Sequence, residues 1–199
     1  EMAAIQGSDV LQLKRLRGSV VNDTLASDRF YGQLNLNELH FFAGGHVAPP
    51  IAGGRIYEYQ HRVYYVKHNA NSIPTLYRHS LSSTALMGVA EPLVEGVEIM
   101  RFEFGIDTNG DSAVDTYLKT SDVTDSLWDQ HRDAEIVSVQ IHLLLRAFEQ
   151  DSAFSAGMTR TYPMLGGTFS VPDDGYRRKH VSTTVVIRNP WLKTAGGMP

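Results

Sequence analysis

The chain has 199 residues, a length that suits one domain with a substantial hydrophobic core. Its 18 basic and 22 acidic side chains give a net charge of −4, which argues against nucleic acid or an anionic membrane surface as a partner. The lack of cysteine excludes disulfides, thiolate zinc sites and cysteine nucleophiles. No apolar run in the sequence approaches the roughly 18 residues of a membrane span.

The first half of the chain reads as β-strands separated by polar turns. Apolar and polar side chains alternate from position 10 to position 17, which is the period of a half-buried strand. A longer run at 55–68 is rich in tyrosine and valine, which favour strands, and a polar turn at 69–72 follows it. The strands predicted here are 10–17, short ones around Leu34, Leu36 and 39–42, then 55–68 and 74–81.

Strand patterns also dominate the second half. Positions 97–106 alternate, and in 135–146 every odd position from 137 to 145 is aliphatic, which predicts a strand with one fully buried face. We expect a weak helix within 121–134, a long and weakly patterned connection over 147–176, and a last strand over 181–188. Because helical patterns between the strands are missing, the sequence predicts an α+β, β-rich fold of mainly antiparallel sheets with little helix, forming a single domain over 1–199.

Four side chains that carry oxygen follow the strand predicted at 97–106. They are Asp107, Asn109, Asp111 and Asp115, at positions 1, 3, 5 and 9 of the spacing by which an EF-hand-type loop wraps a cation. Because Ca²⁺ prefers oxygen donors, these four residues are candidate calcium ligands. The pattern is incomplete, since Ser112 stands where glycine is usual and Leu118 stands where a bidentate Glu is expected.

A turn without metal explains the same loop. Asn109-Gly110 between apolar runs is a signal for a two-residue hairpin turn. A turn that tight would place charge on the apolar face of the strand pair, whereas a five-residue loop at 108–112 would pair Ile106 with Val114. The hydrophobic pattern therefore favours the longer loop between two neighbouring strands. A calcium-binding loop and a polar turn both remain open.

The sequence shows no nucleophile elbow, phosphate-binding loop or zinc-binding helix motif. Its histidines lack the spacing of metal ligands, and His142 falls on the polar face of its predicted strand, which favours a cross-strand partner. The basic run at 177–180 is expected to be a solvated turn whose charge guards an edge strand. The tyrosines at 57–65 fit either stacking on sugar rings or packing within a sheet.

Several of these segments together resemble the globular part of the PilW family of type IV pilus minor pilins. The resemblance spans nearly the whole chain, and its most specific parts are the Asp-rich loop and the two late strands. The residues that carry it are 7–11, 97–106, 107–111, Val114, Asp115, Trp128, 136–146, Arg177, Arg178 and 182–189.

This resemblance implies a non-enzymatic assembly subunit with a β-rich head like that of the minor pseudopilin J of type II secretion. Family members are made as prepilins, and the hydrophobic N-terminal helix that anchors them in the inner membrane is absent from this sequence. The implied partners are other minor pilins and a tip adhesin, and the implied location is the pilus tip, with a periplasmic head before assembly. The implied role is to help initiate pilus assembly, and the shared loop strengthens the expectation of structural Ca²⁺.

Two other functions fit parts of the sequence. One is a calcium-dependent surface or carbohydrate-binding adhesin module, in which the Asp-rich loop contacts the ligand and the tyrosines supply stacking. The other is a periplasmic hydrolase that uses Asp and His, although the sequence shows no nucleophile constellation to support it.

Overall fold

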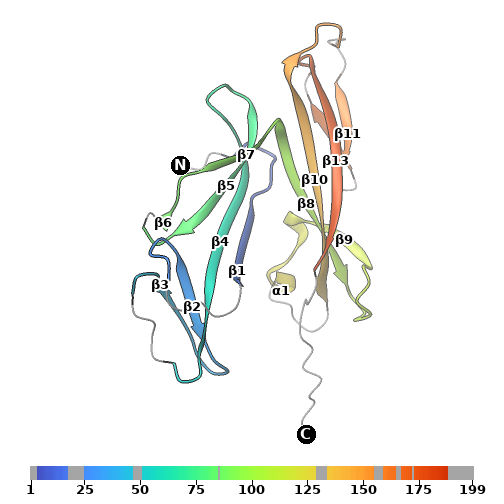
Figure 1. The fold of residues 1–199 in the computed structure, drawn as a ribbon. Helices are drawn as coiled ribbons and strands as arrows, with labels where there is room; N and C mark the ends of the chain where they lie inside the picture. The colour runs from blue at the N-terminus through green and yellow to red at the C-terminus, as the bar shows by residue number, and fades with distance from the viewer. Residues whose placement is uncertain are drawn as a thin grey trace.

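The structure is a computed structural model, which describes residues 4–17, 25–46, 51–84, 86–128, 134–154, 159–164, 167–171 and 173–187. Nearly all of its regular structure is antiparallel β-sheet, arranged as two upright sheets side by side (Figure 1). The β-rich, antiparallel character expected from the sequence is confirmed.

The first sheet is built around the long strand β4, whose tyrosines and β-branched residues suit a pleated surface. Its strand order is β3-β2-β4-β5-β6, with β1 also paired to β4 and β7 to β5. Its strands are β1 (Leu11–Arg17), β2 (Phe30–Leu34), β3 (Leu39–Ala43), β4 (Arg55–His68), β5 (Pro74–Ser82), β6 (Leu86–Met87) and β7 (Glu91–Glu95).

The second sheet has four strands in the order β13-β10-β8-β9, and a separate hairpin of two strands accompanies it. Between β9 and β10 lie the 3₁₀ turn Thr120–Asp122 and the short helix α1 (Asp125–Trp128). The strands are β8 (Val97–Asp107), β9 (Thr116–Lys119), β10 (Glu135–Gln150), β11 (Arg160–Met164), β12 (Gly167–Val171) and β13 (Tyr176–Val186).

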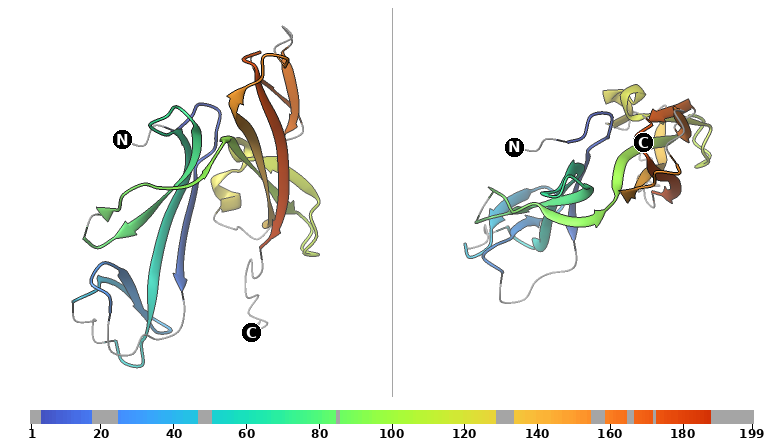
Figure 2. Two further views of the ribbon diagram at one scale, coloured as in Figure 1. Left: turned by 45° about the horizontal axis from the view of Figure 1, so that its top comes forward. Right: turned by 90° about the horizontal axis from the view of Figure 1, so that it is seen from above.

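One hydrophobic core joins the two sheets. Val66 of the first sheet is fully buried and packs with Met100 and Phe102 of β8, which are 4% and 2% exposed. The views in Figure 2 show β8 continuing directly from the strands of the first sheet into the second. Strand β8 therefore connects the sheets in sequence and supplies much of the core between them.

The aliphatic face predicted for the 135–146 strand does not match the structure fully. Of the odd positions from 137 to 145, only Val137 is buried and the others are half-buried, whereas Leu144 and His142 on the opposite face are 0% and 6% exposed. The reason is that the hairpin β11–β12 covers the second face, with Met164 and Val171 packing on Ile99 and Leu144. The sequence does not predict this hairpin, because 147–176 is weakly patterned.

Most strands fall where the sequence places them. The strand at 55–68 is confirmed with its bounds, and the strands at 10–17, 74–81 and 135–146 are confirmed with small changes. The weak helix within 121–134 is reduced to the 3₁₀ turn and α1, and part of that segment lies outside the described residues. Strand β13 begins at Tyr176, earlier than predicted. The predicted end of this strand, Arg188, lies outside the described residues.

Strands β8 and β9 are direct neighbours, as expected, but the predicted register is wrong by two residues. Ile106 pairs with Thr116 rather than Val114, and Phe104 pairs with Leu118. The loop is two residues longer than predicted. The hydrogen bond that closes it runs from the Asp115 N–H to the Ile106 carbonyl at 2.9 Å. Since side chains alternate with period two, this shift keeps every side chain on its expected face.

None of the helices that the structure describes has the length and apolar character needed to cross a membrane.

The shared core predicts a sharp contrast between two apolar substitutions. Phe102→Ala should lower the free energy of unfolding by about 3–5 kcal/mol, because the side chain is buried between the sheets. Leu36→Ala is the matched control, since Leu36 is fully exposed and should change stability by less than about 0.5 kcal/mol. Urea denaturation of both variants measures the difference, and equal small effects would contradict the assignment of Phe102 to the core.

Candidate functional site

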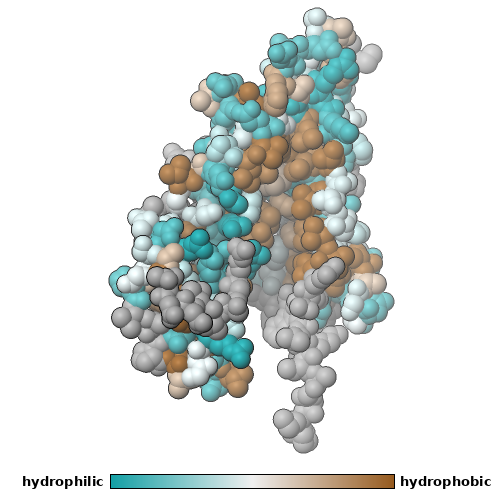
Figure 3. All heavy atoms as spheres, in the orientation of Figure 1, coloured by the Kyte–Doolittle hydropathy of each residue, from teal (hydrophilic) through white to brown (hydrophobic). Residues whose placement is uncertain are grey.

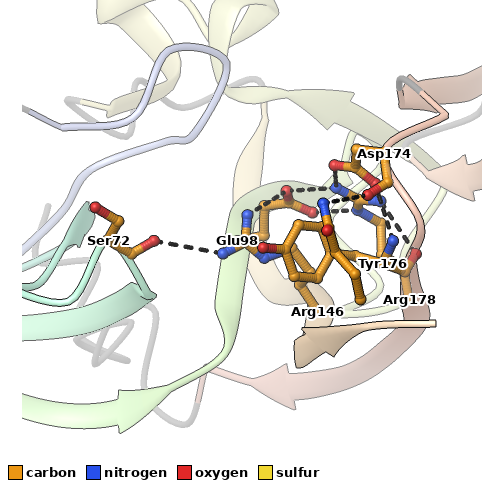
Figure 4. Close-up of polar contacts among 7 residues, drawn as sticks. Ser72, Glu98, Arg146, Asp174, Tyr176 and Arg178 are labelled. Carbon is orange, nitrogen blue, oxygen red and sulfur yellow. Dashed lines mark hydrogen bonds and ion pairs between the residues drawn. The ribbon is translucent and has the colours of Figure 1, made fainter. Parts of the chain in front are cut away.

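The guanidinium of Arg178, near the start of β13, is a buried charged group. The Arg178 side chain is 2% exposed and lies between two carboxylates (Figure 4). Its Nε donates to Glu98 Oε2 of β8 at 2.6 Å, and its Nη2 donates to Asp174 Oδ2 in the preceding turn at 2.6 Å. Two further donations reach Glu98 Oε1 at 2.9 Å and Asp174 Oδ1 at 2.7 Å, so both carboxylates are bound bidentately.

The electrostatics of this group follow from its geometry. Burial disfavours the charged guanidinium, but its hydrogen bonds to Asp174 and Glu98 outweigh that cost and raise the pKa of Arg178 above its ordinary value. The hydrogen bonds from Arg178 in turn hold the pKa of Asp174 below its usual value. Both shifts favour the charged forms of Arg178 and Asp174.

Arg146 extends this charged group toward the first sheet. Its Nη1 lies 3.9 Å from Glu98 Oε1, and its guanidinium stacks over the Tyr176 ring at 4.2 Å from the ring centroid. On its other side Nη2 donates to the carbonyl of Ser72 at 3.4 Å, in the turn between β4 and β5 (Figure 4). We call Glu98, Arg146, Asp174, Tyr176 and Arg178 the arginine clamp, because together they tie β8, β10 and β13 to each other and to that turn.

The sequence does not reveal the clamp, since the basic run at 177–180 is typical of a solvated turn. That interpretation holds for Arg177, whose side chain is 61% exposed and pairs with Asp151 at 2.6 Å. It is wrong for Arg178, which points to the opposite face of β13 and is buried. The available signal was the spacing of Asp174 and Arg178 across a turn, but no local pattern points to Glu98.

The Asp-rich loop is organised by hydrogen bonds from its own backbone. Asp107 is 2% exposed, and its Oδ1 accepts the N–H groups of Asn109 and Gly110 at 3.0 and 2.7 Å. Its Oδ2 accepts the Ser112 N–H at 2.7 Å. Desolvation would raise the pKa of Asp107, but these backbone donors outweigh it and lower the pKa. The carboxylate of Asp107 thus replaces the backbone acceptors that a tight turn would otherwise need.

The other three predicted calcium ligands also take part in the loop's hydrogen bonding. Asp115 Oδ2 accepts both the N–H and the hydroxyl of Thr108 at 2.7 Å, and Asn109 Oδ1 accepts the Asp111 N–H at 2.9 Å. Asp111 Oδ1 accepts the Ala113 N–H at 2.8 Å. Within the described residues, no three His, Asp or Glu side chains form a group that could hold a metal ion. The loop is therefore fully explained as a polar turn, and calcium at Asp107, Asn109, Asp111 and Asp115 stays a prediction.

His142 has the cross-strand partner that the sequence predicted. Its Nδ1 lies 3.0 Å from Nε2 of His180 on β13, and the two rings stack with an interplanar angle of 5°. Its Nε2 lies 3.4 Å from Glu103 Oε2. Burial and the neighbouring His142 lower the pKa of His180. The pair lies between β10 and β13, where it packs these strands together.

The tyrosines of β4 do not form an exposed stacking platform as a group. Tyr65 is 1% exposed and stacks on Tyr77 of β5 with ring centroids 6.0 Å apart. Tyr59 contacts the Phe41 ring of β3 at 4.8 Å. These contacts favour packing within the first sheet, which was the second of the two interpretations.

The second sheet keeps one apolar face partly open to solvent. Figure 3 shows apolar side chains gathered in a band over this sheet. On β10 the half-buried positions are Val139, Ile141, Leu143 and Leu145. Val185 of β13 pairs with Val139 and is 50% exposed, so the apolar face extends to the edge of the sheet. A continuous apolar face of this kind is typical of protein contact surfaces.

The arginine clamp predicts unequal effects of two adjacent arginines. Arg178→Met should lower the free energy of unfolding by about 3 kcal/mol, because it leaves Glu98 and Asp174 without their buried partner. Arg177→Met should cost less than about 1 kcal/mol, because its ion pair with Asp151 is exposed. Thermal and urea denaturation of the two variants test this, and similar losses for both would show that the clamp does not stabilise the fold.

The calcium hypothesis predicts that millimolar Ca²⁺ raises the thermal midpoint of the chain. Asp111→Ala should abolish that rise, because it removes a loop oxygen, whereas Asp28→Ala in the exposed turn before β2 should retain it. Differential scanning calorimetry with calcium and with chelator is the measurement. A thermal midpoint that is the same in both would remove calcium from this loop.

Comparison with known proteins gives one finding about family. Residues 63–189 match the family model described as PilW, type IV pilus-assembly protein W. This range includes the Asp-rich loop, the arginine clamp and all of the second sheet. No curated protein and no solved structure matches the chain. Because the match covers more than half of its length, the chain belongs to the PilW family of type IV pilus-assembly proteins.

Proposed function

We propose that this chain is the head of a minor pilin that takes part in the initiation of type IV pilus assembly at or near the pilus tip. Membership of the PilW family supports a role in pilus assembly. The observation that carries the finer proposal is the open apolar face of the second sheet, formed by odd positions of β10 and β13. A subunit that works by docking among neighbours needs such a surface, and a free-standing domain would gain nothing from leaving it partly uncovered.

The mechanism is one of positioning rather than chemistry. A hydrophobic helix supplied by the precursor holds the subunit in the inner membrane before assembly and in the filament core afterwards. The periplasmic head then presents its apolar face to other minor pilins, and through them to a tip adhesin. Burial of Val139, Ile141 and Val185 against a neighbour contributes roughly 25 cal/mol for each Å² of apolar surface removed from water.

The charged groups of the head support this non-enzymatic role. Arg178 is bound by two carboxylates, and the loop carboxylate of Asp107 accepts three backbone N–H groups. A general acid or base must instead be able to exchange its proton with a substrate. These groups hold strands and turns in place, which is what an assembly subunit requires.

The docking role predicts that a charge on the open face blocks pilus assembly without unfolding the head. In a strain that lacks the gene, wild-type protein should restore surface pili, and Val185→Asp should restore few or none, because it buries an unpaired carboxylate at the contact. Val89→Asp is the matched control, since Val89 is 94% exposed in the connection between β6 and β7 and should restore normal pili.

Pilus counts by electron microscopy measure the outcome, and circular dichroism of both purified heads checks their folding. Normal pili with Val185→Asp would remove the open face from the assembly contact. Normal pili in the strain without the gene would remove the assembly role itself.

A further inference from the structure

We propose that the outer edge of β13 binds a second copy of this chain, through antiparallel pairing of β13 with β13 about a twofold axis at Thr184. Strand β13 lies at the end of the order β13-β10-β8-β9, so only one of its edges is paired within the described chain. This inference goes beyond the pilus role and does not depend on it.

The C-terminal half of β13 lacks the features by which proteins block strand addition. Residues 182–186 read Ser-Thr-Thr-Val-Val, all exposed, with no charge, no proline and no bulge. The other edge strands of the two larger sheets are protected against strand addition, because they are short or carry charged residues or proline. Strands β3, β6 and β9 have only 5, 2 and 4 residues. Strand β1 carries Lys14 and Arg15, and β7 carries Glu91, Pro92 and Glu95.

The hydrogen bonds show which groups of β13 face outward. The Ile187 N–H donates to the Val137 carbonyl at 2.9 Å, so odd positions of β13 bond to β10. The Arg146 N–H donates to the Gly96 carbonyl at 2.8 Å, which confirms that even positions of β10 bond away from β13. The register between β10 and β13 is uniform from Ser138 to Arg146. Alternation along an antiparallel ladder then directs the N–H and C=O groups of Ser182, Thr184 and Val186 to the free edge.

This arrangement is complementary to itself. Antiparallel pairing about Thr184 places Thr184 opposite its own copy and Ser182 opposite Val186 of the second copy. All three positions present outward N–H and C=O groups, so each forms a hydrogen-bonded pair, with two hydrogen bonds per pair. If the register shifted by one residue, the even positions of one copy would lie opposite odd positions of the other, whose N–H and C=O groups already bond to β10. The backbone geometry therefore allows only registers that pair even positions with even positions.

The charges also permit two copies to pair. Within residues 182–186 no side chain is ionised, so no like charges lie opposite each other. The exposed Arg177 and Lys179 lie on the N-terminal side of this stretch, and antiparallel pairing places them at opposite ends of the joined strands. Pairing would also make the two open apolar faces continuous, because Val185 pairs with Val139 within each copy.

Thr184→Pro tests the proposal directly. Proline removes the outward N–H of residue 184 while leaving the inward ladder of residues 183 and 185 intact. By symmetry the substitution deletes two intermolecular hydrogen bonds, so the dissociation constant of the dimer should rise by roughly tenfold or more. Thr184→Val is the matched control, because it keeps the N–H and a β-branched side chain and should leave dimerisation unchanged.

Sedimentation equilibrium from about 1 µM to about 1 mM is the measurement, since a small interface binds weakly. The wild-type chain should shift from monomer to dimer over this range. Monomer at every concentration, or a dimer that Thr184→Pro leaves unchanged, would overturn the proposal. Circular dichroism of the proline variant verifies its fold.

Single cysteines test the register, because the chain has none of its own. In the proposed dimer the two copies of residue 184 form a hydrogen-bonded pair with Cα atoms about 5.5 Å apart, within the range of a disulfide. Residue 182 of one copy lies opposite residue 186 of the other, which is four positions along the strand from that copy's residue 182. The two copies of residue 182 therefore lie about 14 Å apart. With a thiol oxidant, Thr184→Cys should therefore cross-link into a dimer and Ser182→Cys should not. Equal cross-linking of both, or of neither, would overturn the proposed pairing.

Discussion

The ion pairs of Arg178 are the interaction on which the arrangement of the second sheet depends. A guanidinium that is 2% exposed is stable only if its charge is fully bound, and Glu98 and Asp174 bind it from two different segments. Their geometry fixes the start of β13 against β8, and Arg146 links the same group to the Ser72 turn of the first sheet. The clamp therefore sets the register of the last strand and ties the upper ends of both sheets together.

The clamp holds one end of β13, and the other end is paired with β10 along one edge only. The stretch from Ser182 to Val186 bonds to β10 on one side and presents a regular, uncharged edge on the other. The apolar odd positions of β10 lie beside that edge and are covered only in part by the first sheet. A rigid strand beside an incompletely covered apolar face is a favourable contact surface, because little conformational entropy is lost when a partner binds it.

Features set by neighbouring residues could be predicted from the sequence. The alternation in β4 and β10 located both strands. The polar position of His142 predicted that it has a cross-strand partner, and the structure shows that this partner is His180. Features set by distant residues could not be predicted. The pairing of Arg178 with Glu98 joins strands that are 80 residues apart, and the register of β9 depended on the side-chain hydrogen bonds of the loop. The hairpin β11–β12 was missed because its short strands carry little alternation.

Amide hydrogen exchange along β13 tests most directly whether this strand is rigid with one free edge. In dilute solution the account predicts slow exchange at Val181, Thr183 and Val185, whose N–H groups bond to β10, and fast exchange at Ser182, Thr184 and Val186. At high concentration the exchange at Thr184 should slow while that at Thr183 stays the same. Fast exchange at all six amides, or no alternation between odd and even positions, would contradict the account.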